Sequence, residues 1–117
     1  MEMEDQKWER LFAEAHRIVQ ETVARMPLEL RVEAERVPCL FETWPPDDEE
    51  VLGRCLSFEE QVISDAPGPI ILYLGTIHQE CEELGLAFAE EVRITFLHEF
   101  GHHLGLDEAD LEERGLL

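Results

Sequence analysis

The stretch HEFGHHLGLDE, residues 98–108, decides how this chain of 117 residues is organised. His98 and His102 are four positions apart, so on a helix both imidazoles project from one face, one turn above the other. This spacing lets a single zinc ion take two nitrogen ligands at about 2.0–2.1 Å each. Glu99 would lie beside the ion, where its carboxylate can accept a proton from an attacking water. The stretch therefore predicts a metal-binding helix that also carries a general base.

A third ligand is expected from the turn that follows this helix. Gly105 can adopt a positive φ, which ends a helix and turns the chain sharply. Such a turn would carry Asp107 or Glu108 back towards the ion, and the spacing alone leaves both acids open. His103 is adjacent to a ligand but should point elsewhere, as a C-terminal residue favoured by the helix dipole. His78 is interpreted as a surface histidine, with an approach to the metal as the alternative.

The extended motif, HExxHxxGxx followed by an acid, resembles that of the zincin metallopeptidases, including the metzincins and their aspartate-ligand relatives. More narrowly, the chain resembles a family of small bacterial zincin-like metallopeptidases with an HExxHHxG helix near the C-terminus. The resemblance is specific over residues 94–108. Upstream it is loose and rests on length, element order and the apolar run at residues 69–73.

The resemblance implies a site built from four side chains. Zinc would be held by His98, His102 and Glu108, and Glu99 would be the catalytic base. Glu108 stands at the eleventh motif position, where this group of proteins usually has Asp or His. That position favours Glu108 over Asp107 as the third ligand, although Asp107 remains the rival.

The composition indicates one globular domain, residues 1–117, with a strongly acidic surface. The apolar fraction of 44% is ordinary for a globular protein, whereas 28 acidic residues against 9 basic ones give a net charge of −19. Such a charge repels phosphate backbones and anionic lipid headgroups, which argues against nucleic-acid and membrane partners. It would attract basic peptides, although a solvated acidic surface that maintains solubility explains the same charge.

The N-terminus and the cysteines predict a cytoplasmic location. Residues 1–5 contain no basic region and precede no apolar run, so we expect no signal peptide, and no apolar stretch approaches the length of a membrane span. Cys39, Cys55 and Cys81 are odd in number and lack a CxxC spacing, as expected for buried thiols in a reducing compartment. The sequence does not indicate which oligomeric state the protein adopts.

The pattern of apolar residues predicts an α+β fold with an N-terminal helix, a small sheet of two to four strands and further helices towards the C-terminus. The resemblance implies that this is a minimal zincin-like fold, with the C-terminal helix of the motif as the active-site helix. A capping box between Thr76 and Gln79 is expected to open the helix before the last two. Helices are predicted over residues 5–26, 76–84, 87–104 and 110–114. Strands are predicted over residues 31–37, 51–58 and 69–74, with a loop at 44–50 and a turn at 64–68.

Two functions are compatible with the motif. The first is a zinc-dependent metallopeptidase acting on peptides or proteins, with an edge strand of the sheet holding an extended substrate. Only nine residues follow Glu108, and none is a tyrosine or histidine that could stabilise an oxyanion, so we expect weak or narrow activity. Tyr73 and Arg93 are the possible substitutes. The second function is a metal-binding or protein-interaction module that keeps the helix without catalysis.

Overall fold

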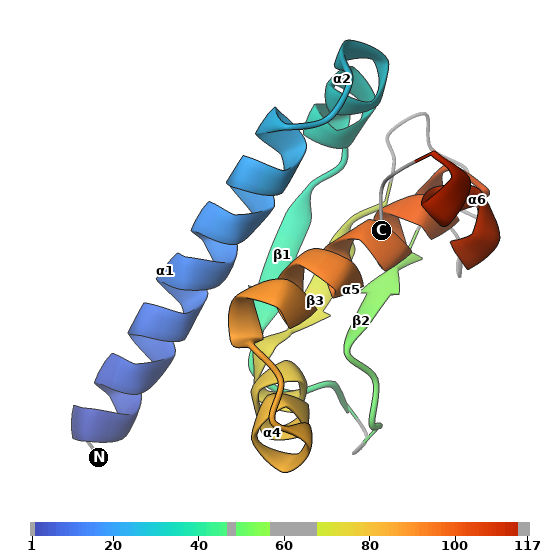
Figure 1. Ribbon diagram of the computed structural model, residues 1–117. Helices are drawn as coiled ribbons and strands as arrows, with labels where there is room; N and C mark the ends of the chain where they lie inside the picture. Colours follow the sequence, from blue (N-terminus) through green and yellow to red (C-terminus); the bar gives the residue numbers. More distant parts are fainter. Residues whose placement is uncertain (1, 47–48, 57–67, 115–117) are drawn as a thin grey trace.

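The computed structural model describes residues 2–46, 49–56 and 68–114, and it arranges helices around a small sheet (Figure 1). This arrangement confirms the predicted α+β fold. The predicted turn at residues 64–68 lies outside the described residues except for Gly68. The elements, in chain order, are α1 (Glu2–Ala24), α2 (Leu28–Arg36), β1 (Cys39–Glu42), β2 (Gly53–Cys55), β3 (Ile70–Tyr73), α4 (Leu74–Leu84), α5 (Phe88–His103) and α6 (Glu108–Glu113).

The sheet has the strand order β1-β3-β2, with β3 in the middle. β1 runs parallel to β3, with Cys39 opposite Ile70, and β2 runs antiparallel to β3, with Gly53 opposite Leu72. Ile70 and Leu72 are fully buried. A continuous apolar run such as the one at residues 69–73 is typical of a central strand that is buried on both sides. The order leaves β2 at one edge of the sheet, and this edge is the one beside α5 and the metal motif.

Helix α5 lies at the centre of the molecule. It crosses the sheet, contacts β2 and β3, and is flanked by α1, α4 and α6 (Figure 1). Phe96 and Phe100 stack with ring centroids 6.0 Å apart, and both are buried beside Val92 and Leu97. Burying each such side chain contributes about 1.5–3 kcal/mol, so this apolar seam fixes the rotation of α5 about its axis. Phe100 is a core residue, as predicted.

The prediction of a strand over residues 31–37 was wrong, because this segment forms helix α2. Its alternation of apolar and charged residues suggested a half-exposed strand. In the helix, Ala34 and Val37 are buried while Val32 is exposed, so the inward positions follow the helical period. Pro27 stands at the N-cap with φ −54°, which suits the start of a helix. The strand that the prediction missed, β1, begins just after α2.

The predicted capping box at Thr76 was also wrong, because α4 begins two residues earlier, at Leu74. Its N-cap is Tyr73, and no side chain caps the helix there. Gly75, directly after the strand predicted over residues 69–74, lies inside α4, and its N–H donates to the carbonyl of Thr43 at 2.7 Å. A Cβ at this position would stand 2.7 Å from the Trp44 ring, so the missing side chain lets the chain after β1 pack onto α4.

The predicted turn after α5 is confirmed. Gly105 adopts φ +75°, and the N–H of Leu106 donates to the Gly101 carbonyl at 2.8 Å, the closing bond of a Schellman motif. Helix α6 then starts at Glu108, two residues before the predicted start, because Asp107 caps it. Leu111 of α6 packs directly over Gly101, where an added Cβ would meet its Cδ1 at 2.7 Å. A glycine in α5 therefore lets α6 fold back against the metal motif.

Candidate metal centre

The two motif histidines meet on one face of α5. His98 Nε2 lies 3.0 Å from His102 Nε2, and the rings are edge to face with centroids 4.6 Å apart. Two imidazole nitrogens on one tetrahedral zinc ion would be about 3.3 Å apart, given Zn–N distances of about 2.0–2.1 Å. The nitrogens are thus almost at the separation that a shared zinc ion requires. Both side chains are half-buried, so the face is open to solvent.

Glu99 completes a cluster that could hold a metal ion. One ligand atom from each of His98, Glu99 and His102 lies within 4.8 Å of the others. The Glu99 side chain passes close to β2: a Cβ added at Gly53 would stand 3.2 Å from Glu99 Cγ and 3.0 Å from the Ile71 carbonyl oxygen. Gly53 lies within the strand predicted over residues 51–58. Its role is to leave room for the motif carboxylate between α5 and the sheet edge.

A cavity of about 380 Å³ opens beside this cluster, between α5 and the segment that contains β2. His98 and Glu99 form part of its wall. Glu91, Thr95 and His98, which lie along one side of α5, line this opening, and Thr95 is almost fully buried. The other lining residues are Val51, Leu52, Gly53 and Ile94. The cavity therefore has an apolar wall on the strand side and a polar wall on the helix side.

The third ligand stays a prediction. The Asp107 carboxylate accepts a hydrogen bond from the Asp110 N–H at 2.8 Å, and the Asp110 carboxylate accepts one from the Asp107 N–H at 3.1 Å. Asp107 is therefore engaged in a capping box that starts α6. Glu108 is the first residue of α6, and its side chain lies outside the described part of the structure. The capping role of Asp107 favours Glu108 as the ligand.

The neighbouring histidines have other partners. His103 Nε2 lies 2.9 Å from Glu33 Oε1 of α2, and its ring stacks on Phe100. This hydrogen bond lowers the pKa of Glu33, with a smaller contribution from Arg36. His78 lies in α4 among Trp8 and Phe88, and Glu82 is 3.4 Å away. Neither histidine belongs to the described metal cluster, and the contact of His103 with α2 was not foreseen.

The two residues considered as oxyanion donors do not line the cavity. Tyr73 is 2% exposed at the end of β3. Arg93 lies on another side of α5, where it pairs with Glu90 and lines a different cavity. In the described part of the chain, the wall beside the metal cluster contains no lysine, arginine or tyrosine.

The cysteines take no part in the described metal cluster. No disulfide joins Cys39, Cys55 and Cys81, and the last two are buried. Burial raises the pKa of the Cys39 thiol to about 12 and also raises that of Cys81. Thiols held in the protonated form are poor nucleophiles and poor metal ligands. The prediction of buried thiols is confirmed for Cys55 and Cys81, whereas Cys39 is half-buried.

The family model for zincin-like metallopeptidases matches residues 27–116, which cover α2 to α6 and the whole metal motif. The chain belongs to this family. Zincin-like metallopeptidases carry a metal, usually zinc, and act on peptides or proteins. No curated protein sequence matches the chain. Helix α1 lies outside the matched residues. None of the described helices is long and apolar enough to cross a membrane.

Proposed function

We propose that this zincin-like protein is a zinc-dependent peptidase of weak or narrow activity. His98, His102 and Glu108 would hold the ion, and Glu99 would be the general base. The observation that carries the proposal is the 3.0 Å approach of the two Nε2 atoms, with the Glu99 carboxylate in the same cluster and a cavity beside them. A bound zinc ion supplies a Lewis acid that polarises a peptide carbonyl and makes a water molecule more acidic.

Glu99 carries the proton through the reaction. Its carboxylate accepts a proton from the water that attacks the peptide carbonyl carbon, and it then delivers that proton to the leaving amine nitrogen as the C–N bond breaks. Gly53 supports this role because it leaves space for the carboxylate beside the edge strand. Ile94 and the apolar residues before β2 exclude water from part of the cavity and strengthen electrostatic interactions within it.

The edge strand β2 supports an extended peptide as the substrate. β2 pairs with β3 on one side, and its Gly53 lines the cavity. A peptide that added to its other side would gain main-chain hydrogen bonds and lie beside Glu99. Glu91 projects into the same cavity and forms no ion pair with any described residue. Its carboxylate, together with the net charge of −19, favours substrates with lysine or arginine side chains.

Weak turnover follows from the lack of a described oxyanion donor on the cavity wall. Losing one such donor typically costs on the order of a hundred- to a thousandfold in rate. Tyr73 is buried and Arg93 faces elsewhere, so neither supports a faster reaction. The same observation favours the second candidate, a module that binds metal and peptide without cleavage.

The test is cleavage of a mixed peptide library, read by mass spectrometry, with zinc-loaded wild type, Glu99→Gln and Glu90→Gln. We expect slow cleavage by wild type, biased towards peptides with basic residues. Glu99→Gln should keep its zinc and lose cleavage by roughly a hundredfold or more, the size of a general-base contribution. Glu90→Gln is the matched control, because it removes an acid from the same helix on the side away from the cavity.

Three results would change the proposal. Cleavage that survives in Glu99→Gln would overturn the role of Glu99. An absence of cleavage by wild type with zinc bound would favour the binding module. Rapid, unselective cleavage would contradict the expectation of weak activity and point to an oxyanion donor outside the described residues.

A further inference from the structure

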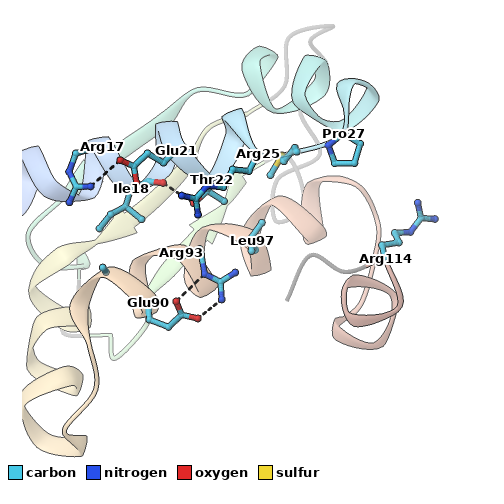
Figure 2. A pocket seen from close by; sticks show the side chains of 12 residues that line it. Arg17, Ile18, Glu21, Thr22, Arg25, Pro27, Glu90, Arg93, Leu97 and Arg114 are labelled. Carbon is cyan, nitrogen blue, oxygen red and sulfur yellow. Dashed lines mark hydrogen bonds and ion pairs between the residues drawn. The ribbon is translucent and has the colours of Figure 1, made fainter.

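A second cavity, of about 520 Å³, lies between α1 and α5 and collects an unusual share of the positive charge (Figure 2). The chain has nine basic residues, and four of them line this one cavity: Arg17, Arg25, Arg93 and Arg114. Two acids, Glu21 and Glu90, also line it, which leaves a net charge of +2. In a chain with a net charge of −19, this is a local inversion of sign.

The arginines fall into two pairs with different surroundings. Arg17 pairs with Glu21 at 3.1 Å along α1, and Arg93 forms a two-point contact with Glu90 along α5 (Figure 2). Arg25, near the end of α1, and Arg114, after α6, are exposed and form no ion pair with any described residue. The first pair is neutralised and held in place. Of the second pair, Arg25 turns its uncompensated guanidinium group toward the space between α1 and α5, whereas the side chain of Arg114 points away from it (Figure 2).

The cavity also has an apolar floor. Ile18 of α1, Met26 just after that helix and Leu97 of α5 are all more than nine-tenths buried, and they line the cavity as well as the core. Its volume falls in the range of about 300–1,000 Å³ that small-molecule sites occupy. An apolar floor under a cationic rim suits a molecule with an apolar body and an anionic head.

We propose that this arginine cavity (Arg17, Arg25, Arg93 and Arg114) binds a small amphipathic anion, with its carboxylate or phosphate at Arg25 and its apolar body over Ile18, Met26 and Leu97. Guanidinium groups suit both heads, because their planar donors match the oxygen pairs of carboxylates and phosphates. The cavity shares no lining residue with the one beside the metal cluster. Arg17 of α1 and Arg25 just after it lie outside the residues that the family model matches, so the proposal does not rest on peptidase chemistry.

Isothermal titration calorimetry with defined probes tests the proposal on the full chain. Octanoate and octyl phosphate supply the two anionic heads on the same apolar body. Acetate and inorganic phosphate supply the heads alone, and octylamine supplies the body with the opposite charge. The rim variant, Arg25→Gln, removes the uncompensated guanidinium group, and Arg25 is exposed, so folding should be preserved. Arg10→Gln is the matched control, because it removes the same charge from an exposed position outside the cavity.

We expect one octyl anion to bind per chain, and we expect the rim variant to weaken binding roughly tenfold or more, since charged hydrogen bonds are lost. The control variant should bind as wild type does. In wild type, methyl chemical-shift changes should concentrate on Ile18 and Met26. The head group that binds more tightly identifies the ligand as a carboxylate or a phosphate.

Other outcomes would overturn the proposal. One is the absence of binding by either octyl anion at millimolar concentration. A second is equal weakening in the control variant, which would show that net charge alone is responsible. A third is binding of inorganic phosphate or octylamine as tightly as octyl phosphate, which would contradict an amphipathic anion as the ligand.

Discussion

Glu90 and Glu91 are adjacent in the sequence, yet they serve two different sides of α5. Glu90 faces α1, pairs with Arg93 and lines the arginine cavity. Glu91 faces β2 and lines the cavity beside the metal cluster, where it has no ion-pair partner among the described residues. Successive helix positions are about 100° apart, which is enough to place neighbours in different surroundings. The helix therefore separates an anionic, metal-binding side from a cationic one.

The buried seam of α5 keeps these two sides apart. Val92, Phe96 and Phe100 hold the helix against the rest of the core, so it cannot rotate to mix them. Leu97 lines the arginine cavity, whereas the next residue, His98, belongs to the metal cluster. The comparison teaches that one short helix can present two sides of different charge when its packing fixes its orientation.

The largest effect is expected when one residue is replaced on each of the two sides of α5 and bound zinc is measured. His98→Ala should reduce bound zinc from about one equivalent to nearly none, because a zinc site needs three protein ligands. Arg93→Gln should leave the zinc content unchanged, since Arg93 is on the other side of the helix. Metal analysis after dialysis against buffer with zinc, with and without chelator, measures both. A wild type that stays metal-free at micromolar zinc would contradict the proposed site.

A smaller effect should distinguish the acid after α5 that binds zinc from the acid that caps α6. Glu108→Ala should weaken zinc binding by at least about tenfold, a size that even outer-shell changes reach. Asp107→Ala should remove the cap of α6, lowering the free energy of unfolding by about 1 kcal/mol while changing zinc affinity little. Zinc titration and thermal unfolding of both variants decide between the acids. If Asp107→Ala weakens zinc binding far more, then Asp107 is the ligand.

The smallest expected effect is a pH-dependent change in the free energy of unfolding, which should differ between variants of the adjacent Glu90 and Glu91. The hydrogen bond from Arg93 holds the pKa of Glu90 below its usual value of 4.5, so the charged form stabilises the fold. That contribution is present above the usual pKa and is lost as the pH falls through the lowered one. Glu90→Gln should therefore cost a few tenths of a kcal/mol at pH 7 and nothing in strong acid. Urea unfolding at both pH values measures the difference.

Glu91→Gln is the control for that comparison. Glu91 forms no ion pair with a residue that the structure describes, so its replacement should leave the free energy of unfolding unchanged at both pH values. An equal loss in Glu90→Gln and Glu91→Gln would show that the contact of Glu90 with Arg93 adds no stability of its own. The difference between the two sides of α5 would then not affect the free energy of unfolding.

Some features could be predicted from the sequence because they depend on local geometry. The spacing of His98 and His102 brings their nitrogens together on any α-helix, and Gly105 permits the positive φ that ends it. The apolar run of β3 requires burial on both sides, which places it in the middle of the sheet. In each case the cause lies within a few residues of the effect.

Other features were decided only by contacts between distant segments. Residues 31–37 alternate as a strand would, but burial of Ala34 and Val37 against the core selects the helix. The missing side chain of Gly53 matters only because Glu99, 46 positions later, passes beside it. The partner of His103 is Glu33, on a helix 70 positions earlier, and the arginine cavity needs α1, α5 and the end of α6 together. The sequence thus determined the metal-binding helix through its local spacing, whereas long-range packing decided what faces that helix on each side.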